Sequence, residues 1–255
     1  MDEKFLKSVA DVVKQAGAIV ETIARDGYET NYKSRMDPVT TADLAANDHL
    51  KRHLLALLPE AGWLSEETRD SAERLSLRYV WIVDPIDGTK EFVQRVPQYA
   101  VSVALSDGGN AILGVVYNPA QDECFTGLVS IGAWLNGTAV RAERSGAGKL
   151  TVLGSRSEIR RGEFERFQTA VDVEPVGSIA YKLALVAAGR ANATWSLGPK
   201  HEWDIAAGVA LINAAGGKVV DPLGREFVFN QKDTLVKGIV AAAANDFTQV
   251  MGMIG

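Results

Sequence analysis

The chain has 255 residues, of which 47% are hydrophobic, and it carries a formal net charge of −5 with a pI near 5.3. This composition excludes a disordered chain, and the acidic balance argues against binders of nucleic acid polymers and membrane surfaces, which need a basic field. The sole cysteine, Cys124, excludes an internal disulfide and a cysteine-based zinc cluster, as is typical of proteins in a reducing compartment.

The first residues of the chain do not have the pattern of a signal peptide. Residues Met1 to Lys4 are mixed in charge and lead into an amphipathic pattern without the apolar block of a signal peptide. No apolar stretch approaches the ~20 residues that a membrane-spanning helix needs. We therefore expect a cytoplasmic protein without a membrane partner.

The first part of the chain predicts two helices. Apolar residues recur at helical spacing from Phe5 to Ile23, which indicates an amphipathic helix that ends near Gly27. A polar segment over residues 31–37 follows, and a second helix is expected after Thr40. Asp43 lies in the first turn of that helix, where a carboxylate complements the helix dipole even if it has no other role.

Two adjacent acids, Glu66 and Glu67, stand between an expected loop and a polar stretch that runs to Arg78. Solvated acids in a loop are the usual explanation of such a pair. By themselves they do not indicate a site.

Residues Tyr79 to Val83 form a short aromatic and β-branched run, the composition of a buried strand, which stops at an acidic turn. Pro85 fixes φ, so that the side chains of Asp84 and Asp87 and the carbonyl of Ile86 can face one small volume. That arrangement is the outline of a hard-cation site.

A helix is expected to open at Gly88 and Thr89, and its free N–H groups would suit a phosphate oxyanion. Metal and phosphate would then lie side by side. Asp-Pro and Asp-Gly are also common turn dipeptides, so the same residues suit an ordinary turn.

The middle of the chain reads as strands and turns. Alternation from Tyr99 to Ser106, a turn at residues 107–110, and further strand-like runs to Leu135 indicate a largely antiparallel sheet. Residues 141–149 are rich in charge, Gly and Ser, and we place a boundary there, between an α+β half (1–145) and an α/β half (146–255).

Strands and helices take turns in the second half, which predicts an α/β arrangement. Asp204 lies near the start of one of these helices, where an acid again complements the dipole. Asn245 is expected to cap the final helix. The expected strands are 150–154, 173–176, 191–197, 218–221 and 239–243, and the expected helices begin near residues 158, 179, 203 and 246.

The string from Asp84 to Thr89 resembles the DP(I/L)DGT signature of the inositol monophosphatase superfamily of Mg-dependent, lithium-sensitive phosphatases. Its continuation to Phe92 resembles the DGTKEF form of the 3'(2'),5'-bisphosphate nucleotidases of the CysQ type. Three more segments are similar to family segments in order and spacing, and the resemblance covers nearly the whole chain: PVTTAD at 38–43, LSEE at 64–67, and WDIAAG at 203–208 followed by AGG at 215–217.

The resemblance implies a fold and a set of roles. The fold would be α/β, a layered αβαβα sandwich of the inositol monophosphatase/fructose-1,6-bisphosphatase type, with the metal site where the two halves meet. Asp43 and Thr89 would pair through a hydroxyl to orient the attacking water, with Glu66 also counted as catalytic, and Gly88 and Thr89 would bind the phosphate. The metal ligands would be Glu66, Asp84, the Ile86 carbonyl, Asp87 and Asp204.

An all-oxygen ligand set suits Mg²⁺, with Mn²⁺ as a possible substitute, and not zinc or copper. Four carboxylates exceed the charge of one divalent ion, which implies a site for on the order of two or three ions. The reaction would be direct attack by a metal-activated water without a covalent intermediate. Family members are often homodimers, so we expect a homodimer that acts on a small phosphorylated substrate.

Substrate choice rests on fewer residues. The inositol enzymes carry an acid a few positions before the WD motif, whereas the corresponding segment here, 196–202, has none at that position. Lys182 matches the lysine that follows the nucleotidase SSxK serines, although those serines are replaced by Ile179 and Ala180. Lys182 and Lys200 could therefore meet a second phosphate, or they could be plain surface charges.

The leading expectation is a phosphomonoesterase that converts 3'-phosphoadenosine 5'-phosphate to AMP. The alternative is an inositol-1-monophosphatase or a phosphatase for another sugar or polyol phosphate, including histidinol phosphate. A catalytically silent metal- and phosphate-binding module would lack Thr89, Asp43 or a ligand, and none is missing.

Overall fold

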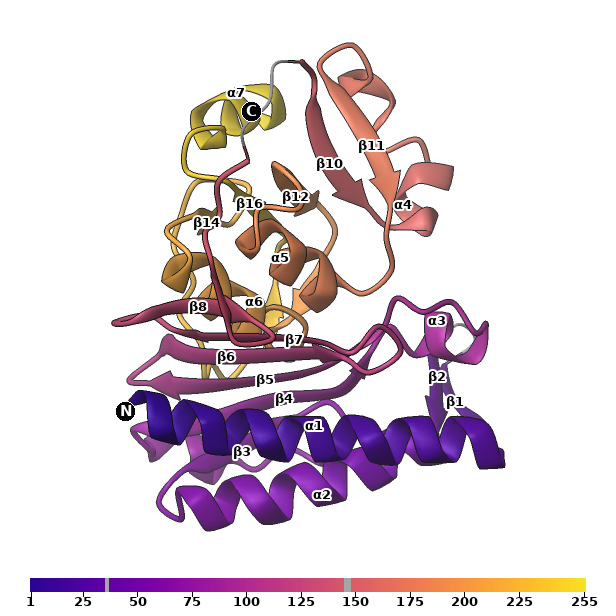
Figure 1. The fold of residues 1–255 in the computed structure, drawn as a ribbon, viewed down its shortest axis with the longest axis vertical. Coiled ribbons are helices and arrows are strands. Elements are labelled where there is room, and N and C mark those ends of the chain that lie inside the picture. Colours follow the sequence, from indigo (N-terminus) through magenta and orange to yellow (C-terminus); the bar gives the residue numbers. More distant parts are fainter. Residues whose placement is uncertain (35–36, 145–147) are drawn as a thin grey trace.

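The computed structural model describes residues 1–34, 37–144 and 148–255 of the chain (Figure 1). The boundary predicted between residues 145 and 146 falls outside the described residues, so the division into two halves stays a prediction.

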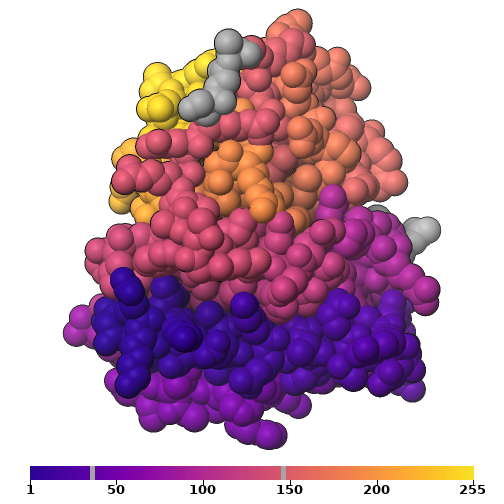
Figure 2. Space-filling view, viewed as in Figure 1, coloured from indigo at the N-terminus to yellow at the C-terminus, as the bar shows by residue number. Residues whose placement is uncertain are grey.

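Two long helices form one outer layer, as predicted. Helix α1 spans Glu3–Asp26 and α2 spans Thr41–Leu57. The Asp2 side chain caps α1 by accepting a hydrogen bond from the Phe5 N–H at 2.8 Å, and Gly27, with a φ of 103°, ends it. Figure 2 shows α1 as a continuous band across one face of the molecule.

A seven-stranded sheet packs against this helix layer, in the order β3-β4-β5-β6-β7-β8-β9. Its strands are antiparallel except for β3 and β4, which run parallel. Alternation along β4 sends Trp81 and Val83 into the core under α1 and α2, whereas Val80 and Ile82 enter a second core on the opposite face. The strands are Gly62–Ser65, Tyr79–Asp87, Ala100–Asp107, Asn110–Asn118, Glu123–Leu128, Gly132–Leu135 and Thr138–Val140.

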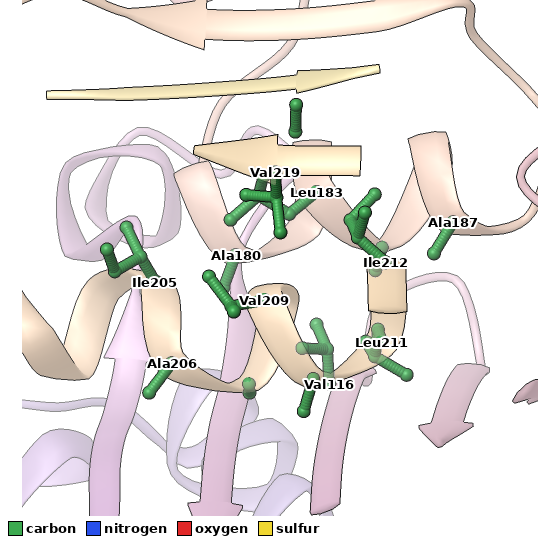
Figure 3. Packing of buried hydrophobic residues seen from close by; sticks show 14 of the residues in the cluster. Val116, Ala180, Leu183, Ala187, Ile205, Ala206, Val209, Leu211, Ile212 and Val219 are labelled. Atoms are coloured by element: carbon green, nitrogen blue, oxygen red, sulfur yellow. The ribbon is translucent and has the colours of Figure 1, made fainter. Parts of the chain in front are cut away.

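Helices α5 (Ile179–Ala187) and α6 (Glu202–Ala214) form the central layer on that opposite face. In Figure 3, Ile205, Val209 and Ile212 of α6 lie toward α5 and Val219, whereas Ala206 lies toward the large sheet. Gly114 of β6 lets α6 approach closely, because a Cβ atom there would lie 2.3 Å from the Ala207 carbonyl oxygen. The N-terminus of α6 is thereby fixed over the sheet.

A five-stranded sheet, in the order β11-β10-β12-β16-β14, covers the other side of α5 and α6. Strands β10, β11 and β12 are parallel, and β12, β16 and β14 are antiparallel. Helix α7 (Phe247–Ile254) covers the outer face of this sheet through Val250 and Ile254. The strands are Leu150–Gly154 (β10), Val171–Pro175 (β11), Ala193–Ser196 (β12), Lys218–Val220 (β14) and Ile239–Ala242 (β16).

The layers therefore alternate as helix, sheet, helix, sheet, helix, and the predicted αβαβα fold class is confirmed (Figure 1). None of the described helices is long and apolar enough to cross a bilayer.

Several short elements were not predicted. Strand β3 lies where a loop was expected, and β1 (Thr30–Ser34) and β2 (Asp37–Thr40) pair antiparallel in the polar segment. Short strands β13 (Lys200–His201) and β15 (Leu235–Val236) also pair, and the 3₁₀ helix η1 spans Ala72–Ser76. The cap predicted for α7 was wrong: Asp246, not Asn245, holds the N-cap position, without a side-chain hydrogen bond to the helix.

Candidate active site

A cleft of about 690 Å³ collects the residues singled out in the sequence. Its walls come from the ends of β3 and β4, the start of α3 (Thr89–Val93), the N-termini of α4 (Arg156–Arg160), α5 and α6, and Lys33 of β1. Every predicted site residue except Asp43 lines this cleft, and Asp43 contacts Thr89 from outside it. The predicted residues that line the cleft are Glu66, Asp84, Ile86, Asp87, Gly88, Thr89, Lys182, Lys200 and Asp204.

Parallel pairing of β3 with β4 brings Glu66 and Asp84 to one sheet edge. Ser65 pairs with Val83, and the Glu66 N–H donates to the Val83 carbonyl at 3.2 Å. Because parallel strands end on the same side, the two carboxylates that follow this pair lie beside each other. Sequence reasoning identified both acids but not the strand that juxtaposes them.

The turn between Asp84 and Asp87 is shaped by local hydrogen bonds. The register against β5 shifts between these residues, and the Ile86 N–H donates to Asp84 Oδ1 at 3.0 Å. Asp87 Oδ2 accepts hydrogen bonds of 2.6 Å from the Ser178 hydroxyl and the Ala180 N–H. One oxygen of Asp87 is thereby held by the start of α5, which orients the other.

The predicted pair of Asp43 and Thr89 is formed. Thr89 Oγ1 lies 3.1 Å from Asp43 Oδ1 and 3.0 Å from the Ile86 carbonyl, and its single proton serves one acceptor at a time. Asp43 Oδ2 accepts from the N–H and the hydroxyl of Thr40, at 2.8 and 2.6 Å. Burial raises the pKa of Asp43 despite these hydrogen bonds.

Asp204 sits in the first turn of α6, where its Oδ2 accepts the His201 N–H at 2.8 Å. Burial, followed by the charge of Asp87, raises its pKa well above the ordinary value. Burial and the charges of Glu66, Asp87 and Asp204 do the same to the pKa of Asp84. Burial also raises the pKa of Asp87 to about 6.

The ion pairs around these acids indicate whether a metal cation would fit between them. Among the described residues, no lysine or arginine forms an ion pair with Asp84, Asp87 or Asp204, and Glu66 is paired with Lys33 at 2.8 Å. A buried group of acids without cations is unfavourable unless something neutralises it, and the donors are all oxygen, so the residues fit a hard divalent ion.

The fit requires some movement. Over the described parts of the chain, no three His, Cys, Asp or Glu side chains already converge as a closed ion cage. Lys33 holds Glu66 at 2.8 Å and also contacts Glu67, and burial, ahead of the hydrogen bond from Lys33 that opposes it, raises the pKa of Glu67 to about 7. Glu66 would have to turn from the ammonium toward the aspartates to bind an ion.

The two predicted substrate lysines differ in environment. Lys182 is 2% exposed, and its Nζ lies 3.4 Å from Glu158 Oε2. Lys200 lines the cleft, and among the described residues the one hydrogen-bond acceptor of its Nζ is the Pro199 carbonyl, at 3.2 Å. Lys182 is therefore already neutralised by a carboxylate, and its role toward a second phosphate stays a prediction, as does that of Lys200.

Comparison with known proteins identifies the family of this chain. Residues 1–251 match the sequence profile of the inositol monophosphatase family. The chain belongs to this family. It is 38% identical over 225 residues to the inositol-1-monophosphatase of Mesorhizobium japonicum, covering 84% of this chain and 81% of that one.

Solved structures of the inositol monophosphatase family superpose over nearly the full chain. The enzyme of Thermotoga maritima has a TM-score of 0.85 at 26% identity, covering 100% of this chain and 97% of that one. CysQ of Bacteroides thetaiotaomicron, described as a bacterial family member, has a TM-score of 0.78 at 26% identity, covering 94% and 97%. The chain is thus a phosphatase of this metal-dependent family, whose members act on small phosphorylated substrates.

Several cleft residues were missed in the sequence. Lys33 lay in a polar segment with no periodic signal, and Glu158 belongs to a short helix, directly followed by Arg161, whose partners are distant in the chain. Ser178 could have been found, because a serine directly before a predicted helix is the usual N-cap. It caps α5 and holds Asp87 at once.

Proposed function

We propose that this inositol monophosphatase family member is a Mg²⁺-dependent phosphomonoesterase that removes the 3'-phosphate of 3'-phosphoadenosine 5'-phosphate, by direct attack of water. The observation that carries the phosphatase chemistry is that four acids and Thr89 line one cleft, with Thr89 Oγ1 lying 3.1 Å from Asp43 Oδ1. We also propose a cytoplasmic homodimer, from the sequence and the family alone.

Thr89 and Asp43 would handle the proton of the attacking water. With the Thr89 proton donated to Asp43, the lone pairs of Oγ1 are free to accept a hydrogen bond from a water in the cleft. Thr40 fixes the other oxygen of Asp43, so the carboxylate cannot rotate away. Burial raises the pKa of Asp43, which increases its capacity to hold a proton.

The acids would hold on the order of two or three Mg²⁺ ions, with Mn²⁺ as a substitute. The ligands would be Glu66, Asp84, the Ile86 carbonyl, Asp87 and Asp204. When bound, Mg²⁺ supplies the positive charge that lets a phosphate dianion enter a carboxylate-rich cleft.

The phosphate would be held at the turn into α3. Gly88 has a φ of 96°, which a side chain would strain, and the residue after it begins the helix. The first N–H groups of a helix have no acceptor within it, so those of Gly88 and Thr89 are suited to phosphate oxygens.

A doubly phosphorylated substrate is supported by the charges on the far wall of the cleft. Lys200 and Arg161 line that wall, and Arg161 is also paired with Glu163 at 2.6 Å. Glu158 pairs with Lys182, and no acid among the described residues forms an ion pair with Lys200. Lys200 is therefore the cation on this wall that is available to a second anionic group.

Inositol 1-phosphate is the second candidate, and one observation favours it. The curated relatives at 30 to 38% identity are mostly named inositol monophosphatases. Other sugar or polyol phosphates, including histidinol phosphate, belong to the same alternative.

The test is phosphate release with Mg²⁺ from the nucleotide and from inositol 1-phosphate in parallel, compared as kcat/KM, with Asp84→Asn as the blank. A preference of at least about tenfold for the nucleotide is expected, equivalent to about 1.4 kcal/mol of transition-state discrimination. A preference for inositol phosphate would transfer the assignment to the alternative. Release from neither substrate would remove both.

A further inference from the structure

A buried polar network lies outside the cleft and is centred on Arg74, a residue without a role in the proposed reaction. Arg74 of η1 is one of the largest fully buried side chains, at 2% exposure. Its guanidinium donates to both oxygens of Asp70, at 2.6 and 2.8 Å. It also donates to Asn230 Oδ1 at 2.7 Å and to the Gln231 carbonyl at 3.0 Å, more than 150 residues away in the chain.

The network continues to the start of α6. Asn230 returns a hydrogen bond from Nδ2 to the Arg74 carbonyl at 3.0 Å. The N–H groups of Asn230 and Gln231 donate to the two oxygens of Glu202, at 2.7 and 2.8 Å. Glu202 is 1% exposed and is the first residue of α6, two positions before Asp204.

At its other end the network touches the strand that leads to Glu66. Gly62 opens β3, and a Cβ atom there would lie 3.0 Å from Arg74 Cβ and 3.2 Å from its Cα, so the two backbones are in close contact. Glu66 directly follows this strand. An unbroken series of contacts therefore joins the carriers of Glu66 and Asp204.

Stability alone does not explain why these buried residues are polar and charged. Well-packed apolar side chains commonly stabilise a core as well as buried charges do, whereas a hydrogen-bonded charge network fixes one relative arrangement of its members. Asn230 suits the joint, since its φ of 61° aims its N–H at Glu202 while its amide meets Arg74.

We propose that Arg74, Asn230 and Glu202 form a positioning bridge that sets the separation between Glu66 and Asp204, and so the affinity of the cleft for divalent ions. None of the three contacts the reacting groups. The inference rests on the proposed metal-dependent site, but its test does not need turnover.

The experiment measures Mn²⁺ binding by isothermal titration calorimetry on the intact chain. Asn230→Gly removes both side-chain bonds to Arg74 and keeps the backbone conformation and the N–H to Glu202. Arg74→Lys keeps a charge beside Asp70 but cannot also reach Asn230 and Gln231. Asn230→Asp, which keeps an acceptor for Arg74, is the conservative variant.

A matched control is Asn192→Ala. Asn192 is 8% exposed and more buried than Asn230, and its side chain donates to Asp246 Oδ2 at 2.8 Å and accepts the Thr151 N–H at 2.9 Å, away from the cleft. It reports what the loss of a structural asparagine does to the melting temperature and to ion binding.

We expect Asn230→Gly and Arg74→Lys each to weaken Mn²⁺ binding about tenfold, with Asn230→Asp recovering most of it and Asn192→Ala unchanged, each variant being measured well below its own melting temperature. Wild-type affinity in both bridge variants overturns the proposal. If Asn230→Gly does not fold, Arg74→Lys alone decides. If the wild-type chain binds no Mn²⁺, the proposed metal-dependent function is wrong as well. The failure of the bridge alone is thereby distinguished from the failure of the proposed function.

Discussion

Asp84 is the buried acid of the cleft at which burial and the charges of the neighbouring acids act together against ionisation. It is 2% exposed, and burial and the charges of Glu66, Asp87 and Asp204 all raise its pKa. Its one hydrogen-bond donor among the described residues is the Ile86 N–H, at 3.0 Å. Such a carboxylate weakens the folded state until a cation compensates it, which is common where function and stability conflict.

Asp84→Asn separates these two effects. Without metal, the variant should melt a few degrees higher than the wild type, because relief of about 1 kcal/mol corresponds to about 2–4 °C in a chain of this size. With Mg²⁺, its kcat/KM should fall by at least about 10³-fold, since a ligand to the ion is lost. Thermal unfolding in EDTA and a phosphate-release assay check both. A metal-free melting temperature below that of the wild type would show that Asp84 is structural.

Glu158 and Lys182 behave as a unit. Burial by itself would raise the pKa of Glu158, but the Lys182 ammonium and hydrogen bonds from Ser155 and Ser196 outweigh it and hold this pKa at about 2. Removing one member leaves the other charged in the core, so Glu158→Gln or Lys182→Met should each cost about 3–5 kcal/mol. The double variant should lose less than the sum, as a double-mutant cycle by urea unfolding would show.

The same pair predicts a response to acid. A carboxyl whose folded pKa lies below its ordinary 4.5 binds fewer protons than in the unfolded chain, so its stabilisation is complete above that pH and is lost as the pH falls toward about 2. Wild-type unfolding free energy should therefore drop more steeply in this window than that of Glu158→Gln. Parallel acid curves for the two proteins would contradict the assignment.

Among the elements, α2 links stability and chemistry through its first turn. Thr40 caps the helix, and the same side chain and its N–H hold Asp43 in a capping box. Thr40→Ala should cost about 1 kcal/mol of stability. Because Asp43 Oδ2 then loses the hydroxyl donor and keeps only the N–H of residue 40, Asp43 is held less firmly, and kcat should also fall about tenfold with KM little changed.

Thr40→Ser is the control, since it keeps the hydroxyl and should keep kcat. Urea unfolding and steady-state kinetics measure the two effects separately. A kcat that is unaffected by Thr40→Ala would mean that Thr89 and the N–H of residue 40 orient Asp43 without the Thr40 hydroxyl.

Elements with strong periodicity were predictable from the sequence, and the junctions between them were not. The apolar stripe of α1 and the alternation of β5 and β6 identified those elements, and the strings at residues 84–89 and 203–208 identified the acids. Strand β3 has four residues, too few for a pattern, so its pairing with β4 was hidden. Lys182 looked free because its partner Glu158 lies 24 residues away on another element.

At the scale of the whole molecule, the cleft draws residues from separate parts of the fold: the large sheet, the N-termini of α5 and α6, and α4, which follows strand β10 of the small sheet. Asp43 of α2 contacts Thr89 without lining the cleft. Ligands from separate layers are brought together only by folding. Metal binding should therefore be linked to global stability, and removal of the metal by a chelator should lower the free energy of unfolding.

This linkage has a defined pH dependence. In the metal-free protein the pKa of Asp87 is about 6, above its ordinary 3.8, because burial outweighs the hydrogen bonds from Ser178 and Ala180. The folded state thus binds more protons than the unfolded chain, and the contribution of Asp87 to stability falls as the pH rises through this interval. Mg²⁺ needs the ionised carboxylates and relieves their repulsion, so its stabilising effect should grow from about pH 5 to about pH 7.5.

At a Mg²⁺ concentration near 100 times its Kd, the expected gain is about 2.7 kcal/mol, or a rise in melting temperature of about 5–10 °C. Thermal unfolding in EDTA and in Mg²⁺, at several pH values across this interval, measures the gain. Asp84→Asn should show little of it at any pH. A Mg²⁺ effect of equal size at every pH, or one fully retained in that variant, would mean that the ion binds somewhere other than these carboxylates.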